Sequence, residues 1–171
     1  MRVLIVSDSH GQTEELSDVI TRHRQEVNLI IHCGDSELEA NSKELDGVSV
    51  VEGNCDYQHD QFPEEIRKEL GDYVLYVTHG HHYNVKMTYV PISYKGEEVG
   101  ANIVCFGHSH VATSFSENGI VYINPGSLRL PRNRSEQTYV ICELSTNEVK
   151  VSFHERETGA LIEELSETFL F

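Results

Sequence analysis

Five short polar clusters hold the residues of this chain that are most able to do chemistry. They contain four histidines, two aspartates and one asparagine, and they read Asp8-Ser9-His10, Gly34-Asp35, Gly53-Asn54, His79-Gly80 and His108-Ser109-His110. Each cluster follows directly on a short apolar run of the kind that forms a β-strand. These side chains are common metal ligands, and the set is too large for one ordinary site and about right for two. The clusters therefore predict a two-metal hydrolase.

The spacing and types of these residues narrow the kind of metal site. Asp8 and His10 are two residues apart, as are His108 and His110, so in extended backbone each pair would point to one side. In open α/β sheets, ligands gather beyond the carboxyl ends of the strands. Imidazole with carboxylate and amide oxygen favours Mn, Fe, Co, Ni or Zn over pure Mg or Ca sites. We expect two divalent transition-metal ions, with manganese as the first candidate.

The elements that must position the clusters alternate between strand and helix in the first third of the chain. We expect strands at 3–6, 27–33 and 48–52, with helices at 12–23 and 36–45 between them. This alternation is typical of βαβ units with parallel strands.

The rest of the chain favours hairpins. We expect paired strands at 66–70 with 73–78, 111–116 with 120–123, and 138–144 with 149–156, and a further strand at 102–106. Residues 85–99 are weakly helical, and Pro91 should end or kink any helix there. Residues 159–171 could form a helix or a last strand. The overall expectation is two packed sheets with outer helices.

Composition sets limits on the class of protein. The chain has 171 residues, the length of one ordinary domain, and a net charge of −15. Such acidity argues against a broad nucleic-acid surface, whereas two divalent ions would still attract a small phosphorylated ligand. The four cysteines are widely spaced, as expected of reduced thiols in a cytoplasmic protein. We expect neither a signal peptide nor a membrane span.

In their order, the motifs D-x-H, G-D, G-N, H-G and G-H-x-H resemble those of the calcineurin-like metallophosphoesterase superfamily. The chain looks most similar to its small bacterial and archaeal phosphodiesterases of the YfcE type. The motifs span residues 8 to 110, and the turn Asn124-Pro125-Gly126-Ser127 is similar too. The resemblance implies that residues 1–171 form one domain, a four-layer αββα sandwich. It also implies hydrolysis of a small phosphodiester by a hydroxide that bridges two ions.

The resemblance further implies a ligand set. One ion would be held by Asp8, His10, Asp35 and His110, and the other by Asp35, Asn54, His79 and His108. Asp35 would bridge the two. Ions in such pairs lie ~3.5–4 Å apart and hold the attacking and leaving oxygens of an in-line displacement.

Cys55 departs from the pattern of many family members. They read G-N-H-(D/E) where this chain reads Gly53-Asn54-Cys55-Asp56. That histidine is expected to protonate the leaving alkoxide, and a neutral thiol is only a weak donor. We therefore expect phosphodiesters rather than monoesters with poor leaving groups. Cys55 and Asp56 are candidates to line the site, and His81 could replace the missing acid or lie in a solvated loop.

Arg129 and Arg132 follow the Asn124–Ser127 turn and are candidates to bind a substrate phosphate, with a solvated basic loop as the alternative. Two other functions remain open. A non-catalytic scaffold, like the retromer scaffold subunit of this superfamily, would tend to have lost ligands, whereas all seven positions are filled here. A nuclease would need a basic surface. A homo-oligomer is possible.

Overall fold

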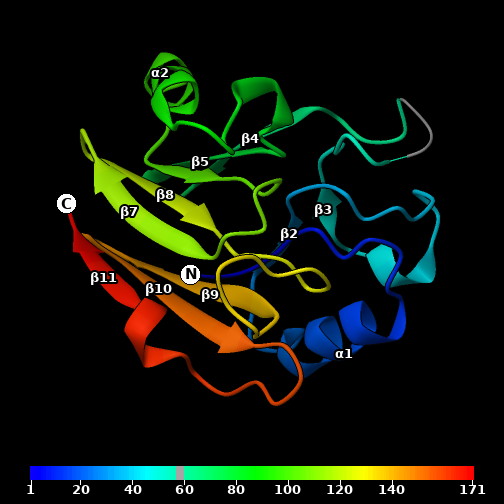
Figure 1. Ribbon diagram of the computed structural model, residues 1–171. Helices are drawn as coiled ribbons and strands as arrows, with labels where there is room; N and C mark the ends of the chain where they lie inside the picture. The colour runs from blue at the N-terminus through cyan, green and yellow to red at the C-terminus, as the bar shows by residue number, and fades with distance from the viewer. Residues whose placement is uncertain (57–59) are drawn as a thin grey trace.

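The computed structural model describes residues 1–56 and 60–171 and builds them into two β-sheets (Figure 1). The first sheet has the strand order β11-β10-β9-β1-β2-β3, and the second has the order β4-β5-β6-β8-β7. The first contains β1 (Arg2–Val6), β2 (Leu29–His32), β3 (Ser49–Val50), β9 (Thr138–Ser145), β10 (Glu148–Glu155) and β11 (Glu167–Leu170). The second contains β4 (Glu65–Leu70), β5 (Tyr73–Thr78), β6 (Ile103–Cys105), β7 (Thr113–Glu117) and β8 (Ile120–Asn124).

Alternation along β1 shows how the layers form. Val3 and Ile5 point into the apolar core between the two sheets, whereas Leu4 and Val6 belong to a second core beneath helix α1 (Glu14–His23). Successive residues of a strand face opposite sides, so one strand serves both cores. A third core lies between the second sheet and helix α2 (Val90–Glu98). The helices flank the packed sheets on opposite sides (Figure 1), which confirms the predicted four-layer arrangement.

Strand direction brings the polar clusters together. β1 pairs in parallel with β2, and β2 with β3, while β5 pairs in parallel with β6 in the second sheet. The loops that follow these strands therefore leave the same edge of each sheet, as the sequence predicts. The three predicted hairpins are confirmed as β4–β5, β7–β8 and β9–β10.

The helix predicted at 36–45 is wrong. Only a short 3₁₀ turn, η1 (Lys43–Leu45), forms there. Glu37 adopts a left-handed φ of 55°, and its N–H donates to Asp56 Oδ1 at 2.8 Å. The N–H of Ala40 donates to Gln61 Oε1 at 2.7 Å. These side-chain acceptors come from a distant loop and replace the carbonyl groups that a helix would use.

Two other predictions are settled near Pro91 and at the end of the chain. Pro91 lies in the first turn of α2 instead of ending a helix, because the first turn needs no N–H from it. In the tail, β11 pairs with β10 after a short 3₁₀ turn, η3 (Glu163–Leu165), so the strand alternative is right. β3 is shorter than the predicted 48–52.

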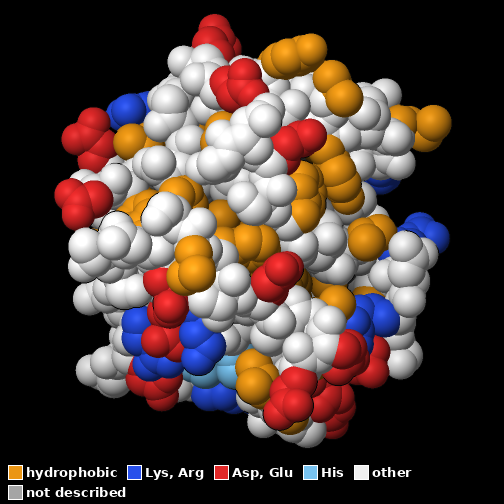
Figure 2. Space-filling view, turned by 90° about the vertical axis from the view of Figure 1, so that its left-hand side faces the viewer, with side chains coloured by type: hydrophobic (Ala, Val, Ile, Leu, Met, Phe, Trp, Pro, Cys, Tyr) orange, Lys and Arg blue, Asp and Glu red, His pale blue; other side chains and the backbone are white. Residues whose placement is uncertain are grey.

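One face of the molecule, on the side where the C-terminus lies, is shown in Figure 2. Hydrophobic side chains come to the surface across its middle, acidic side chains are spread over it, and basic ones lie among them near its lower part. Within the described residues, no helix combines the length and the apolar character that crossing a membrane requires.

Candidate metal centre

Three loops of the centre share an unusual backbone conformation. In each, a serine lies between two residues in the left-handed region. These residues are Asp8 (φ 53°) and His10 (44°), Asp35 (54°) and Glu37 (55°), and His108 (65°) and His110 (58°). Asp8 and His10 thus do not continue the extended backbone considered from the sequence, yet His10 Nε2 still lies 3.8 Å from Asp8 Oδ1. Strain of this kind costs about 1–3 kcal/mol per residue and clusters at functional sites.

Backbone contacts hold these loops against one another. The N–H of Asp8 donates to Gly34 O at 3.1 Å, and that of His10 donates to Asp35 O at 3.0 Å. Across the two sheets, the N–H of His108 donates to Asp8 Oδ2 at 3.2 Å. Gly53 permits a close approach, since a Cβ there would lie 2.8 Å from Asp35 Cγ and would clash with its carboxylate oxygen and backbone nitrogen.

The centre itself is a set of imidazole nitrogens facing two buried carboxylates. His110 Nε2 lies 3.1 Å from Asp8 Oδ1, and His79 Nε2 lies 3.2 Å from Asp35 Oδ2. His10 Nε2 is 3.2 Å from His110 Nε2. Asp8 Oδ1 is buried and accepts no hydrogen bond within the described residues. A buried carboxylate oxygen beside ring nitrogens is the arrangement that a bound cation would satisfy.

Each of these three rings is fixed by its other nitrogen. His10 Nδ1 lies 2.6 Å from Glu37 Oε1, His79 Nδ1 2.7 Å from Cys33 O, and His110 Nδ1 2.7 Å from Leu130 O. Carbonyl and carboxylate oxygens only accept, so each Nδ1 carries a proton and each Nε2 faces the centre. This second layer of contacts is typical of histidines that bind metals.

Asn54 and His108 complete the predicted set. Asn54 Oδ1 lies 3.2 Å from His79 Nε2. The ring of His108 stands edge-on to that of His79, with 5.1 Å between their centroids. The structure thus gathers all seven predicted residues at one place. Among the described residues, three groups have ligand atoms within 4.8 Å of one another and could hold an ion: Asp8, His10 and His110; Asp8, Asp35 and His79; and His10, Asp35 and Cys55.

Sequence reasoning missed Glu37, which holds His10. The only signal for it was local: Asp35-Ser36-Glu37 has the same polar–serine–polar form as Asp8-Ser9-His10 and His108-Ser109-His110.

The charges of the centre are strongly coupled. Burial opposes ionisation of Asp8, but the neighbouring His110 and His79 outweigh it and lower the pKa of this carboxyl. Burial likewise opposes ionisation of Asp35, and its contact with His79 still lowers its pKa. Burial disfavours a charge on His79, yet the two carboxylates raise its pKa. The carboxylates thus draw positive charge into the centre.

Comparison with known proteins places this chain in a family. The sequence pattern of the calcineurin-like phosphoesterase superfamily domain matches residues 1–147. The chain belongs to the calcineurin-like phosphoesterase superfamily. The predicted family is thereby confirmed, and membership supports a phosphoesterase that uses divalent metal ions.

Three similar proteins agree with this placement. The chain is 47% identical over 165 residues to the probable metallophosphoesterase YsnB of Bacillus subtilis, covering 96% of each chain. A solved structure of a predicted phosphoesterase from Streptococcus pneumoniae is 33% identical, with a TM-score of 0.94, covering 99% of this chain and 97% of the other. The phosphoesterase YfcE from E. coli shares the fold at 20% identity, with a TM-score of 0.68 and 99% of each chain covered.

The other residues predicted to line the site or to bind substrate differ in what they contact. The carboxylate of Asp56 is turned to backbone groups and accepts from the N–H of Gly53 at 2.6 Å and of Asp35 at 3.1 Å, so it holds two loops together. Arg129 donates a hydrogen bond to the carbonyl of His10 and supports the loop after β1. Arg132 instead lines a cavity beside the centre together with His108 and His110.

Cys55 and His81 adjoin the centre in uncharged forms. Burial and the nearby Asp35 carboxylate raise the pKa of the Cys55 thiol to about 11, so the thiol stays protonated. Burial and the charge of His79 lower the pKa of His81 to about 4, so this ring is neutral at pH 7. Neither group is a strong acid or a thiolate nucleophile in this environment.

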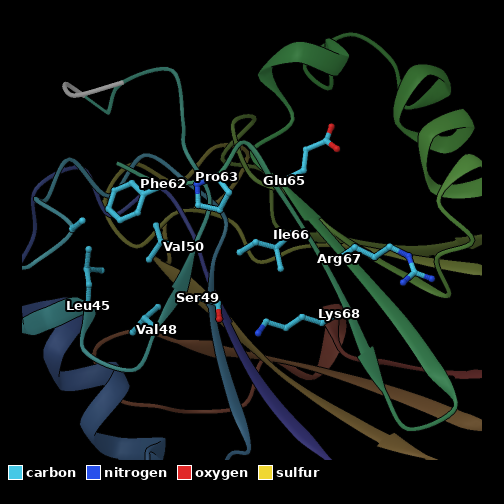
Figure 3. A pocket seen from close by; sticks show the side chains of 11 residues that line it. Leu45, Val48, Ser49, Val50, Phe62, Pro63, Glu65, Ile66, Arg67 and Lys68 are labelled. Atoms are coloured by element: carbon cyan, nitrogen blue, oxygen red, sulfur yellow. The ribbon is translucent and has the colours of Figure 1, made fainter. Parts of the chain in front are cut away.

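A cavity larger than those beside the centre lies elsewhere. It measures ≈580 Å³ and lies between the edge strands β3 and β4, where Leu45, Val48, Val50 and Phe62 gather on one side (Figure 3). Lys68 extends toward Ser49 across it. None of the predicted metal ligands lines this cavity, so its size does not mark the reactive centre.

Proposed function

We propose that this protein is a two-metal phosphodiesterase that hydrolyses small phosphodiesters. The observation that carries the proposal is the convergence of three imidazole Nε2 atoms on two buried aspartates. Asp8 Oδ1, without a hydrogen bond among the described residues, faces them. A buried acceptor left in this state costs about 1–3 kcal/mol. A cation between this oxygen and the ring nitrogens would remove that cost.

By analogy with the motif order of the family, two ions would share Asp35. The first would be bound by Asp8, His10, Asp35 and His110, and the second by Asp35, Asn54, His79 and His108. This mixed nitrogen and oxygen set suits borderline divalent ions, with manganese as our first candidate and nickel, iron, cobalt and zinc as alternatives. When bound, such a pair lowers the pKa of a water molecule and stabilises charge on phosphate oxygens.

The side chains of the centre have their own tasks in this proposal. Glu37 and the carbonyls of Cys33 and Leu130 keep three rings aimed at the ions. Asp35 would bind metal through Oδ2, which faces His79. Its other oxygen, Oδ1, accepts from the N–H of Cys55 at 2.7 Å and keeps the carboxylate in place. Pre-set ligands of this kind need no reorganisation when the substrate arrives.

The position after Asn54 favours diesters over monoesters. Cys55 keeps its proton there and donates weakly, and His81 is neutral at pH 7. The leaving alkoxide of an unactivated monoester would find no strong acid among these groups. We therefore expect diesters, and activated esters in general, to react best.

We further propose that residues 1–171 form one domain of this family. Residues beyond 147 supply β10 and β11, which extend the six-stranded sheet and are part of its core. A cytoplasmic location, which suits the buried free thiols of Cys33, Cys105 and Cys142, remains a prediction.

The test uses purified protein loaded with Mn²⁺, with bound metal measured directly. Bis(4-nitrophenyl) phosphate and 4-nitrophenyl phosphate are compared, and we expect the diester to be hydrolysed faster. Asp35→Asn, which removes the shared charge, should abolish turnover of both. Protein that demonstrably holds metal and hydrolyses neither ester would overturn the proposal.

A further inference from the structure

A cavity of ≈340 Å³ opens beside the metal centre and carries two cationic side chains. His108 and His110 form one part of its lining, and Lys86 and Arg132 form another. Both cations are exposed, and neither makes an ion pair or a side-chain hydrogen bond with the part of the chain that the structure describes. They are therefore available to an anionic ligand.

The backbone keeps both cations next to the centre. The N–H of Arg132 donates to His110 O at 3.0 Å, and His110 Nδ1 in turn donates to Leu130 O at 2.7 Å. Lys86 follows Val85, a buried residue of the core beneath α2. Lys86 lines the same cavity as His108 and His110.

A second cavity that adjoins the centre is lined by carboxylates instead of Lys and Arg. It measures ≈360 Å³, and its lining includes Asn54 and His81, together with Glu52, Glu64 and His82. Glu64 lies 3.9 Å from His82 Nε2. A negatively charged group is disfavoured beside the exposed Glu64 carboxylate, so the centre favours one orientation of an asymmetric anion.

We infer that the substrate carries a second anionic group, a carboxylate or a phosphate, and that Lys86 and Arg132 bind it. The inference rests on the proposed function, because it takes the diester to react at the adjoining centre. The chain has a net charge of −15, so its overall field opposes an anionic substrate and local cations must offset it. A guanidinium binds carboxylate and phosphate alike through paired hydrogen bonds, and an ammonium adds a point charge.

Four 4-nitrophenyl phosphodiesters of matched length test the inference. They share the nitrophenyl group and differ in the second alcohol, which is ethylene glycol, choline, glycolate or ethylene glycol monophosphate. For the Mn²⁺-loaded protein we expect kcat/KM on both anionic diesters to exceed that on the glycol diester by about tenfold, or ~1.4 kcal/mol. The choline diester should be the poorest. The preference should shrink as salt rises, because exposed charges are screened.

Charge-neutral variants assign the preference to these residues. Lys86→Gln and Arg132→Gln should each reduce the ratio of anionic to glycol diester, and the double variant should bring it near one. Lys68→Gln is the matched control, since Lys68 lines the distant cavity between β3 and β4. Calorimetry with two products, 2-phosphoglycolate and 2-hydroxyethyl phosphate, gives a readout without turnover, and the same ratio should appear in Kd.

The outcomes separate this inference from the proposed function. Equal rates on the glycol and anionic diesters, or an equal loss on all four in the double variant, would overturn the inference and leave the phosphodiesterase intact. Metal-loaded protein that hydrolyses none of the four would overturn both. A preference for either anion supports the inference, and the better of the two identifies the group.

Discussion

Glu37 Oε1 lies 2.6 Å from His10 Nδ1, and this contact fixes the ring whose other nitrogen faces the metal centre. Glu37 comes from the loop after β2 and His10 from the loop after β1, so the pair also joins two neighbouring strands at their carboxyl ends. A carboxylate that holds the far nitrogen of a ligating histidine raises the basicity of the ring and fixes its tautomer.

Removing this carboxylate should weaken metal binding. For Glu37→Ala we expect Mn²⁺ affinity to fall about 10- to 100-fold, because His10 loses its fixed orientation. Glu37→Gln retains an acceptor oxygen, so its Mn²⁺ affinity should lie between those of the wild type and Glu37→Ala. Competition with a fluorescent chelator measures the affinity, and Glu39→Gln, an exposed change two residues away, is the control. Equal affinities for the Glu37→Ala and Glu39→Gln proteins would refute the role of Glu37.

Metal should stabilise the fold through Asp8. At a free Mn²⁺ concentration 100 times its Kd, binding to the native state adds about 2.7 kcal/mol to the free energy of unfolding. Asp8→Asn removes the charge that faces His110 and should abolish the gain from the ion that Asp8 binds, while the gain from the second ion remains. The metal-free forms of both proteins serve as the baseline. Urea unfolding with and without a chelator checks this. An equal gain in the variant would mean that the ion binds elsewhere.

Gly53 tests how tightly the loops are packed. In Gly53→Ala the new Cβ would clash with the backbone nitrogen and carboxylate of Asp35, so the loops must move apart. Overpacking of this kind costs typically about 1–3 kcal/mol, and metal affinity should fall with it. Gly71→Ala is the contrasting control.

Gly71 lies in the β4–β5 turn at a φ of 64°, with no atom within 4 Å of the position that a Cβ would take. Its substitution should cost about 1–2 kcal/mol through backbone conformation alone and leave metal affinity unchanged. If both glycine variants bind metal equally well, close approach at Gly53 is unimportant.

The sequence predicts this site better than it predicts the path of the chain around it. Apolar runs followed by polar residues locate the strand ends, and parallel pairing then brings Asp8 and Asp35 together whatever the details of the loops. The left-handed backbone at Asp8 and His10 leaves no comparable signal, because it depends on contacts with Gly34 and Asp35. The failed helix at 36–45 has the same origin, since its backbone groups bond to Asp56 and Gln61.

A histidine far from the centre should make stability depend on pH. His23 is the buried last residue of α1, and its Nε2 lies 2.8 Å from the hydroxyl of Tyr139. Burial lowers its pKa in the folded state below the ordinary 6.5. Between the two pKa values the unfolded chain binds more protons, so this contribution to stability is complete above about pH 6.5 and is lost as the pH falls. In His23→Asn the loss is absent, so the gap between wild type and variant should narrow on acidification. Urea unfolding of metal-free protein from pH 7.5 to 5 measures this difference in stability, and the titration of histidines at the centre cancels in it.

Tyr139→Phe, which removes the hydroxyl without changing a titrating imidazole, should lower stability by about 1 kcal/mol and keep the pH dependence of wild type. Parallel curves for wild type and His23→Asn would show that His23 does not titrate differently on folding.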